Sequence, residues 1–330
     1  MNHLSTSAEI VISVVIPARN SEKTLDASLS ALANQSIDRN KYEIIVIDDG
    51  SSDGTFEIAS KGADLVVRLE GKGAAAARNT GVNHSKGAVI LFTDADCEPC
   101  SKWVECMSHP ILSGVADGCK GTYLSNQGEP IARFVQFEYE DKYRRMAKDE
   151  NIDFIDTYSA SFKREVLETL GGYDESFPGA SVEDQEFSFR ASSAGYRFIF
   201  VPLGKVWHYH CDSIWCYTRK KFKIAYYKVR VLKDHPQKIF RDSHTPQTLK
   251  IQMLLVVLFI ITGLGSLVFP GFSFLPVLCF GLFLVSSIPM VVRILPKDPV
   301  VAFFAPIFLL FRSLALSAGL LVGVFIGRLR

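Results

Sequence analysis

The hydrophobic and polar positions divide the chain into two parts that differ in pattern. Up to about residue 210, short apolar runs alternate with polar segments in which leucine or alanine recurs at helical spacing. The first four runs occupy residues 10–16, 42–47, 64–69 and 87–92. Because strands that alternate with helices build right-handed βαβ units, the pattern predicts an α/β domain with a doubly wound, mostly parallel sheet.

Beyond residue 250 the chain is apolar almost without interruption. Three stretches, 251–269, 272–292 and 300–327, each reach the roughly 20 residues that a helix needs to cross a bilayer. Basic residues before the first stretch, and Arg293 and Lys297 after the second, predict that both of these ends face the cytoplasm. No cationic, apolar leader opens the sequence, so we expect a multi-pass protein of the inner or plasma membrane whose polar part is cytoplasmic.

The third apolar stretch contains an arginine, Arg312, and three glycines at four-residue steps, Gly319, Gly323 and Gly327. Glycines at this spacing suit close packing of helices in a membrane. An arginine within such a segment is costly and marks a function, and a lipid phosphate is a candidate partner. The sequence leaves open whether this stretch spans the bilayer, re-enters it or lies at its surface.

The segment between the two parts, residues 214–250, is basic and aromatic. Its apolar residues recur at helical intervals, and lysines and arginines lie between them. This pattern predicts an amphipathic helix on an anionic membrane surface, and a fully solvated charged helix is the alternative. Nucleic acid is not an expected partner, because apolar stretches follow directly. The predicted domains are therefore 1–213, 214–250 and 251–330.

Composition adds little to this division. The chain has 330 residues, is 48% hydrophobic and carries a net charge of +1. Its seven cysteines show no framework spacing, which fits a reducing compartment. Cys97 and Cys100 form a single C-x-x-C without a second pair, so we expect reduced thiols with no metal or redox role.

Two carboxylates, Asp94 and Asp96, follow the fourth apolar run at a spacing of Asp-x-Asp. Open α/β sheets bind their ligands just outside the carboxyl ends of their strands. Hard divalent cations such as Mg²⁺ or Mn²⁺ take oxygen ligands and often bring a substrate diphosphate. The motif predicts such a cation site, although a turn with two solvated acids would look the same.

A glycine turn at residues 71–73 precedes an alanine-rich helix. It matches neither a P-loop nor a dinucleotide-binding fingerprint. Lys72 and Arg78 could face a diphosphate, or the turn could simply begin a helix.

The motifs together resemble family 2 glycosyltransferases with the GT-A fold, and the resemblance runs from about Val11 to His210. It rests on segments that occur in order: 13–20, 45–55, 77–81, 92–96, 171–175, 182–187, 194–196 and 206–210. The resemblance implies an inverting transferase that uses a nucleoside-diphosphate sugar, with a UDP type favoured, and a divalent cation, Mn²⁺ or Mg²⁺.

The resemblance also implies a role for each matching residue. Asp49 would accept from a uracil-type N–H, Asp184 would be the general base, and Asp96 with His208 would bind the metal. Asp94 would bind the nucleotide near its ribose and diphosphate and is a further candidate metal ligand, and His210 is a less favoured alternative to His208. The remaining residues expected to bind the nucleotide or substrate are Pro17, Arg19, Asn20, Glu22, Lys72, Arg78, Ala95 and Glu183.

Two features qualify the resemblance. Arg19 stands where an aromatic residue is common, so base stacking is not inferred there. The Gln-x-x-Arg-Trp motif of processive synthases is absent, which favours the addition of one sugar per encounter. A carboxylate that takes a proton from a hydroxyl is what sugar transfer needs, but Asp184 could also serve only as an acid at a helix start.

The sequence therefore predicts a membrane-anchored, metal-dependent glycosyltransferase with a lipid-linked or polysaccharide acceptor. One alternative is a polyprenyl-phosphate monosaccharide synthase, in which the nucleophile is already an anion. Another is a catalytically silent membrane protein that binds a nucleotide sugar. A nucleotidyltransferase is disfavoured because no glycine-rich segment follows the first strand.

Overall fold

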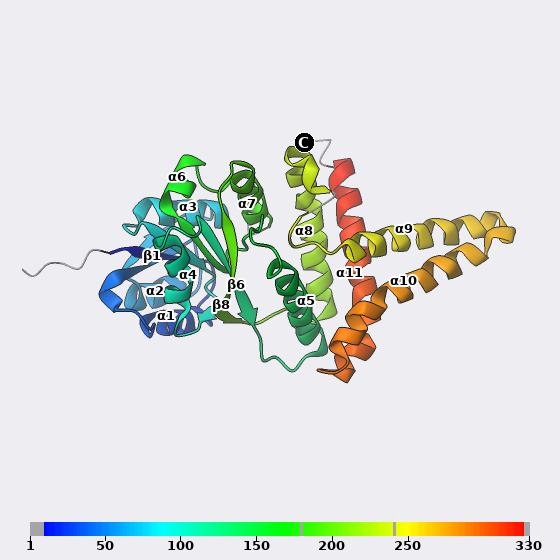
Figure 1. The fold of residues 1–330 in the computed structure, drawn as a ribbon, viewed down its shortest axis with the longest axis horizontal. Helices are drawn as coiled ribbons and strands as arrows, with labels where there is room; N and C mark the ends of the chain where they lie inside the picture. The colour runs from blue at the N-terminus through cyan, green and yellow to red at the C-terminus, as the bar shows by residue number, and fades with distance from the viewer. Residues whose placement is uncertain (1–9, 179–180, 240–241, 327–330) are drawn as a thin grey trace, which may run out of the picture. The chain divides into compact units, whose positions relative to one another are not determined.

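The computed structural model describes residues 10–178, 181–239 and 242–326, and Figure 1 shows its ribbon. The chain forms two compact units. The first contains the residues up to Leu124 and Tyr143–Tyr209, and the second contains Ser125–Lys142 and the residues from His210 onward. Residues 1–9, Gly327, Arg328 and Arg330, which entered the sequence analysis, lie outside the described residues.

The first unit is built on one mixed sheet with the strand order β3-β2-β1-β4-β7-β6-β8-β5. Strands β3, β2, β1 and β4 are mutually parallel, as the sequence predicts, and β7 joins β4 in the antiparallel direction. The strands are β1 Ile12–Ala18, β2 Tyr42–Asp48, β3 Leu65–Arg68, β4 Val89–Thr93, β5 Cys97–Pro99, β6 Gly118–Leu124, β7 Ser159–Lys163 and β8 Phe198–His208. The doubly wound α/β fold is thus confirmed.

Helices cover this sheet. Strands β2 and β4 are buried along their whole length, which explains why they read as unbroken apolar runs. The helices of the first unit are α1 Leu25–Ala33, α2 Thr55–Gly62, α3 Ala74–His84, α4 Trp103–Leu112, α6 Arg164–Thr169 and α7 Glu183–Ser193, with a short 3-10 turn η1 at Arg39–Lys41.

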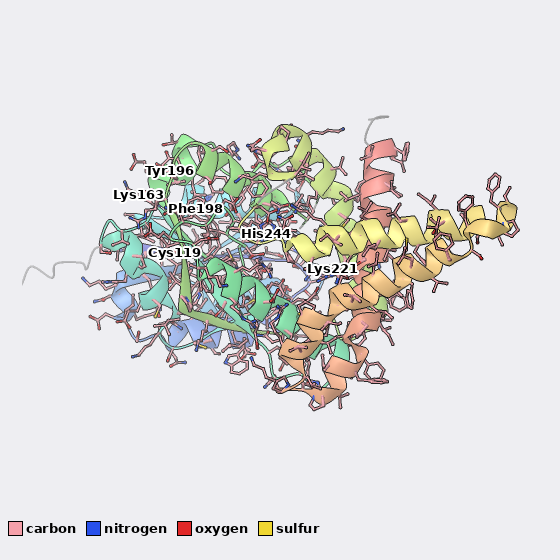
Figure 2. All side chains as sticks on the ribbon, turned by 45° about the vertical axis from the view of Figure 1, so that its right-hand side comes forward. Cys119, Lys163, Tyr196, Phe198, Lys221 and His244 are labelled. Atoms are coloured by element: carbon pink, nitrogen blue, oxygen red, sulfur yellow. A yellow bond between two sulfur atoms is a disulfide. The ribbon has the colours of Figure 1, made fainter. Side chains whose placement is uncertain are left out.

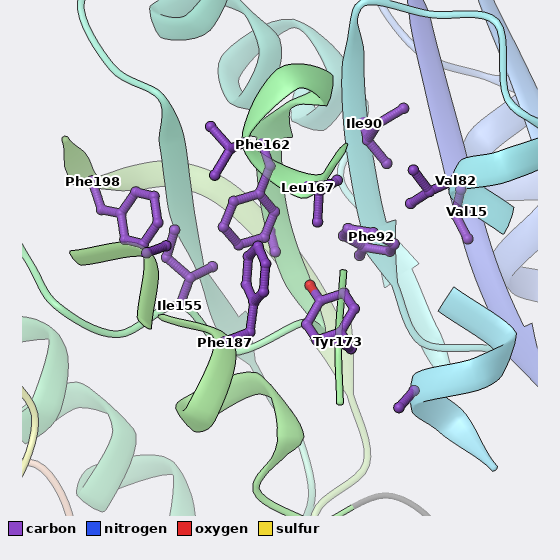
Figure 3. Close-up of a cluster of buried hydrophobic side chains, with 14 of the residues drawn as sticks. Val15, Val82, Ile90, Phe92, Ile155, Phe162, Leu167, Tyr173, Phe187 and Phe198 are labelled. Carbon is purple, nitrogen blue, oxygen red and sulfur yellow. The ribbon is translucent and has the colours of Figure 1, made fainter. Parts of the chain in front are cut away.

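An aromatic core fixes α7 to the sheet (Figure 3). Phe187 of α7 meets Phe162 of β7 edge to face, with ring centroids 5.3 Å apart. The ring of Tyr173 contacts two other rings, with centroid distances of 4.8 Å to Phe187 and 5.6 Å to Phe92. Such aromatic pairs each add about 0.5–1.5 kcal/mol beyond the burial of their surface. The first half of α7 is therefore fixed to the sheet by aromatic contacts.

The second unit is helical (Figure 1). Three of its helices, α9, α10 and α11, are long and apolar enough to cross a membrane, as predicted. Helix α5 runs from Pro130 to Met146, and its residues up to Lys142 belong to this unit. The other elements are α8 Ile214–Asp234, η2 Pro236–Ile239, α9 Gln247–Val268, η3 Pro270–Phe272, α10 Phe274–Ile294 and α11 Pro299–Ile326.

Helix α8 packs along α11 at two glycines. A Cβ atom added at Gly319 would collide with the carbonyl oxygen of Phe222, and one at Gly323 would collide with that of Tyr226. The close packing expected from the glycine spacing is therefore present. The apolar face of α8, which the sequence analysis placed on a membrane, is instead covered by α11 where Ala225 lies.

Arg312 pairs with a carboxylate of the same unit. Its Nη1 lies 2.7 Å from Glu138 Oε1 on α5, and its Nη2 donates to Gln252 Oε1 of α9 at 2.7 Å. Lys221 of α8, labelled in Figure 2, lies 3.1 Å from the other oxygen of Glu138. The sequence analysis named a lipid phosphate as a candidate partner of Arg312. In the structure, Arg312 pairs with Glu138 instead.

Three further charges of the apolar end also pair with α5. Arg293 lies 3.1 Å from Asp141, Lys297 lies 2.8 Å from Glu140, and Asp298 lies 2.9 Å from Arg133. The sequence analysis did not foresee that α5 joins the helices beyond residue 250, because the partners are more than 100 residues apart. The predicted boundaries at 213 and 250 stay predictions.

Two of the seven cysteines form a disulfide, Cys211 with Cys216, whereas five are free. The sequence analysis expected reduced thiols throughout. Cys211 precedes the N-cap Ser213 of α8 and Cys216 lies in the first turn, so the turn brings their Cα atoms to 5.7 Å. This spacing is within the range that a disulfide needs.

Candidate active site

Three neighbouring parallel strands deliver the predicted residues to one edge of the sheet. Ala18, the last residue of β1, pairs with Asp48, the last residue of β2, and β4 ends at Thr93. The residues that follow these strands, Arg19, Asp49 and Asp94, therefore begin loops at the carboxyl edge. Open α/β sheets bind ligands at this edge.

Asp49 holds the loop that precedes α3. Its two carboxylate oxygens accept from the backbone N–H of Lys72 at 2.6 Å and from that of Gly73 at 2.9 Å. The guanidinium of Arg19 lies 3.8 Å away and is more than half exposed. Gly73 has φ of 97°, a conformation that favours glycine. Asp49 therefore shapes this loop, and its role toward a nucleotide base stays a prediction.

Asn20 and Glu22 bind the loop after β2. Asn20 Oδ1 accepts from the N–H of Ser52 at 2.9 Å, and Glu22 Oε2 accepts from that of Gly54 at 2.9 Å. These bonds give both side chains a local structural task, and their predicted contacts with a nucleotide are untested. Pro17 is half-buried near the end of β1, and Ala95 is buried between the two acids.

Arg78 of α3 joins two acidic segments of the edge. It is only 4% exposed, and its guanidinium lies 2.8 Å from Glu183 Oε1 and 3.4 Å from Asp94 Oδ1. Burial lowers the pKa of Arg78, but Glu183 and Asp94 raise it more strongly, so the group stays charged. This buried ion pair favours a positioning role over the direct diphosphate contact that the sequence analysis considered.

Asp184 is the second residue of α7, which fits its expected place at a helix start. Its Oδ1 accepts from the N–H of Gln185 at 2.8 Å. The neighbouring Glu183 is buried and accepts from the N–H of Ser181 at 2.7 Å. An acid in the first turn is favoured by the helix dipole. Asp184 is thus held at the start of a helix while it remains partly exposed.

Asp96, Cys97 and His208 bring an oxygen, a sulfur and a nitrogen within 4.8 Å of one another. Strand β5 pairs with β8 so that Cys97 lies directly opposite His208. The Nδ1 of His208 lies 3.6 Å from Asp96 Oδ1 and 3.8 Å from Cys97 Sγ. His210, in contrast, belongs to the second unit, where its Nε2 lies 2.9 Å from Gln136 Oε1.

The donor atoms of this cluster fit a divalent cation. A carboxylate and an imidazole are common ligands of Mn²⁺, and the half-exposed Asp96 would leave a bound cation accessible to a substrate. Burial, and then Asp94 and Asp96, raise the pKa of the Cys97 thiol well above its usual value. Mn²⁺ and Mg²⁺ prefer oxygen ligands to a soft thiolate, so Asp96 and His208 are better candidates than Cys97.

Comparison with known proteins identifies the family. A model described as glycosyl transferase family 2 matches residues 13–171. Glycosyltransferase AglE of Haloferax volcanii is 31% identical to the chain over 231 residues, which make up 66% of this chain and 70% of AglE. The chain belongs to glycosyl transferase family 2. A second relative of this family 2 glycosyltransferase is UDP-Glc:alpha-D-GlcNAc-diphosphoundecaprenol beta-1,3-glucosyltransferase WfgD of Escherichia coli, 30% identical over 132 residues, 38% of this chain and 51% of WfgD.

Solved structures support the GT-A fold of this family 2 glycosyltransferase. Mannosyltransferase PcManGT from Pyrobaculum calidifontis, in complex with GDP-Man and Mn²⁺, matches with a TM-score of 0.57 and 19% identity. The match covers 96% of this chain and 87% of that one. TarS 1-349 of S. aureus in complex with UDP matches with a TM-score of 0.50 and 16% identity, over 96% of this chain and 92% of that one.

Sequence reasoning missed two residues that shape the edge of this family 2 glycosyltransferase. The side-chain amide of Asn79, next to Arg78, donates to the carbonyl of Tyr173 and accepts from its N–H, both at 2.8 Å. Asn79 lies within the segment 77–81 that carries the resemblance, so its position was signalled although its role was not.

Tyr123 of β6 is the second such residue, and its ring stacks on His208 with centroids 4.5 Å apart. On its other side it stacks on Tyr158, whose hydroxyl accepts from the buried Lys120 ammonium at 2.8 Å. Tyr123 lies outside all the segments that carry the resemblance to glycosyl transferase family 2, so nothing in the sequence pointed to it.

Proposed function

We propose that this family 2 glycosyltransferase moves one sugar from a nucleoside diphosphate, with UDP favoured, to an acceptor carried by a membrane lipid or a polysaccharide. The observation that carries the proposal is the gathering of Asp94, Asp96, His208 and Arg78 with the start of α7 at the ends of the parallel strands. This set contains a candidate base, candidate metal ligands and the ion pairs that hold them.

In the proposed reaction, Asp184 takes the proton of the acceptor hydroxyl. The acceptor oxygen then forms a bond to the anomeric carbon, while the bond from that carbon to the diphosphate oxygen breaks and the nucleoside diphosphate leaves. Arg78 holds Glu183, and through it the first turn of α7, at a fixed place. A positioned base contributes roughly 10²–10⁴-fold in rate.

We propose Asp96 and His208 as the protein ligands of a divalent cation, Mn²⁺ or Mg²⁺, with Asp94 as a further candidate. When bound, the cation would neutralise the charge that develops on the departing diphosphate. The GT-A neighbour PcManGT was solved with Mn²⁺, which supports a divalent cation but does not bear on its ligands here. Asp49, Arg19 and the Lys72 loop are proposed to receive the nucleotide.

The lipid-linked acceptor is proposed from two observations. The second unit provides three apolar helices of membrane-spanning length, and the relative WfgD is named for an acceptor on diphosphoundecaprenol. We propose that these helices anchor the enzyme in the inner or plasma membrane with the first unit in the cytoplasm. A polyprenyl-phosphate monosaccharide synthase is the second candidate, because it too would need a lipid beside the site.

The test uses purified full-length protein in lipid nanodiscs. Radiolabelled UDP and GDP sugars are offered with polyprenyl phosphate or with a polyprenyl-diphosphate sugar, with and without chelation of metals. We expect one donor to label the lipid extract, and chelation to abolish the labelling until Mn²⁺ or Mg²⁺ is restored. Binding of a donor without transfer to any acceptor would favour the silent binding protein.

The variant Asp184→Asn tests whether Asp184 acts as the base for the acceptor or instead helps to bind the donor. We expect its transfer rate to fall roughly 10²–10⁴-fold with little change in donor affinity, because the base faces the acceptor. A much smaller fall would favour the polyprenyl-phosphate synthase, whose nucleophile is already ionised. Asp26→Asn, an exposed acid of α1, serves as the control. A loss of donor affinity in proportion to the rate would overturn the base assignment.

A further inference from the structure

The three apolar helices of the second unit differ in how far the protein covers them. Of the 18 most apolar consecutive residues, 11% are buried in α9 and 22% in the segment Pro270–Ile294, which contains α10. In α11 the buried share is 44%. In α9, the consecutive residues 258–261 are all exposed, and successive residues point to different sides of a helix. The hairpin of α9 and α10 is therefore apolar on all sides, as a segment surrounded by lipid must be.

Helix α11 has two unlike faces. One face is buried and carries Arg312, Ser313 and Gly319. The other is an exposed apolar stripe that contains Val300, Phe303, Phe304, Ile307, Phe311 and, about four turns later on the same side, Phe325. A helix at the rim of a membrane bundle and a helix in the membrane interface both have one covered face and one face toward lipid, so the neighbours of α11 decide between the two.

The contacts between α11 and α9 are those of crossing helices. Arg312 Nη2 binds Gln252, and Ser317 Oγ donates to the carbonyl of Met253 at 3.4 Å. Along α11 these two residues are about 7.5 Å apart, whereas their partners on α9 are neighbours about 1.5 Å apart. Moreover, Arg312 is near the middle of α11 and Gln252 is near the start of α9, so the two helices do not run side by side (Figure 1).

Helix α11 instead runs beside α8 in the same direction. Gly319 lies against Phe222, and Gly323, one turn later, lies against Tyr226. Helix α8 carries Lys220, Lys223, Lys228 and Arg230. Each such charge costs about 2.5–3.5 kcal/mol at the centre of a bilayer, so α8 must stay out of the hydrocarbon. Its long partner α11 must then stay close to the surface as well.

The charged residues around Arg312, namely Glu138 and Lys221, also indicate that α11 stays close to the membrane surface. If α11 crossed the bilayer, its middle would carry Arg312, Glu138 and Lys221 to the hydrocarbon centre. If α11 lies in the plane of the membrane, these charges stand at the level where α9 begins. We infer that α9 and α10 cross the bilayer as a hairpin, and that α11 lies along the interface on the side where α9 begins, with its phenylalanine stripe in the lipid.

Epitope tags test the number of crossings in the full-length chain. Tags are placed before Met1, after Gly271 between the hairpin helices, and after Arg330, and sealed cells are treated with protease before and after permeabilisation. We expect the Gly271 tag to lie on the side opposite to both end tags. End tags on opposite sides would mean three crossings, and all tags on one side would mean none; either result overturns the inference.

Depth in the membrane provides a second test that does not depend on tags. A fluorescent amino acid is incorporated at Phe303, Phe311 or Phe325, and quenched by nitroxide lipids labelled at different depths. All three positions are expected at one shallow depth, about 5–10 Å below the headgroups. A control at the exposed Leu258, in the middle of α9, should lie deeper, near the centre about 15 Å down. If α11 crosses the bilayer, Phe311 will be the deepest of its three positions, near the centre about 15 Å down, and the inference is wrong.

Discussion

Two buried arginines, Arg78 in the first unit and Arg312 in the second, stand in opposite charge surroundings. Arg78 is met by the two carboxylates Asp94 and Glu183, whereas Arg312 shares the single carboxylate of Glu138 with Lys221. Acids outnumber the arginine in the first cluster, and cations outnumber the acid in the second. In both, the arginine joins helices or strands that are far apart in the sequence.

The difference shows what each cluster is suited to do. Around Arg78, Glu183 is buried, but Asp94 is partly exposed at the sheet edge, where its negative charge attracts a cation. Around Arg312 the cluster is closed by Gln252 and by the hydroxyl of Tyr217, which donates to Glu138 at 3.0 Å. The first arrangement suits a reaction site, and the second suits a joint between helices.

The largest expected effect comes from removing the arginines in turn. Arg78→Met leaves Glu183 buried without its partner, which should lower the stability of this region by about 3–5 kcal/mol. Arg312→Met should cost less, about 1.5–3 kcal/mol, because Glu138 keeps Lys221. Hydrogen exchange measured by mass spectrometry reports the two regions separately, through the amides of α7 and of α8.

Double variants sharpen this contrast. Adding Glu183→Gln to Arg78→Met removes the orphaned charge and should recover part of the lost protection in α7. Adding Glu138→Gln to Arg312→Met should instead lower protection in α8 further, because Lys221 then loses its carboxylate. Recovery in both double variants would contradict the proposed difference between the clusters.

The sequence predicted the parts of the fold that depend on local pattern. The four parallel strands, the helix start at Asp184 and the three apolar helices follow from periodicity and charge over short windows. The pairing of α5 with the apolar end could not be read, because charges such as Glu138 and Arg312 are far apart and have many candidate partners in a linear sequence. The membership of α5 in the second unit depends on those pairs.

The sequence predicted the candidate site only in part, as it did the fold. Asp96 and His208 lie together as the motifs suggested, and Arg78 lies at the predicted edge. The sequence could not tell that Arg78 would be buried in ion pairs, or that Asn20 would bind a loop. These facts depend on which strands become neighbours.

The second expected effect is a pH dependence of the second unit. Burial raises the pKa of Glu138, but Lys221 and Arg312 lower it more, so the pKa lies below its usual 4.5. A carboxyl with a lowered pKa in the folded state stabilises fully above the unfolded value and loses this stabilisation as pH falls. Protection of α8 should therefore decline below about pH 4.5, with a slope of at most one proton.

Glu138→Gln provides the control for this titration. It keeps the shape of the side chain but removes the ionisable group, so the decline assigned to Glu138 should disappear. Tyr217, which donates to Glu138, stays in place in this variant. A decline of the same size in the variant would show that another group is responsible.

The smallest expected effect concerns Tyr123, whose ring stacks on His208. A stacked aromatic pair contributes about 0.5–1.5 kcal/mol, so Tyr123→Leu should raise the Mn²⁺ concentration for half-maximal transfer roughly 2- to 10-fold. Tyr123→Phe keeps the ring and should behave like the wild type. Donor affinity without metal should not change in either variant. An equal weakening by Leu and Phe, or none by Leu, would show that the stacked ring does not position the histidine.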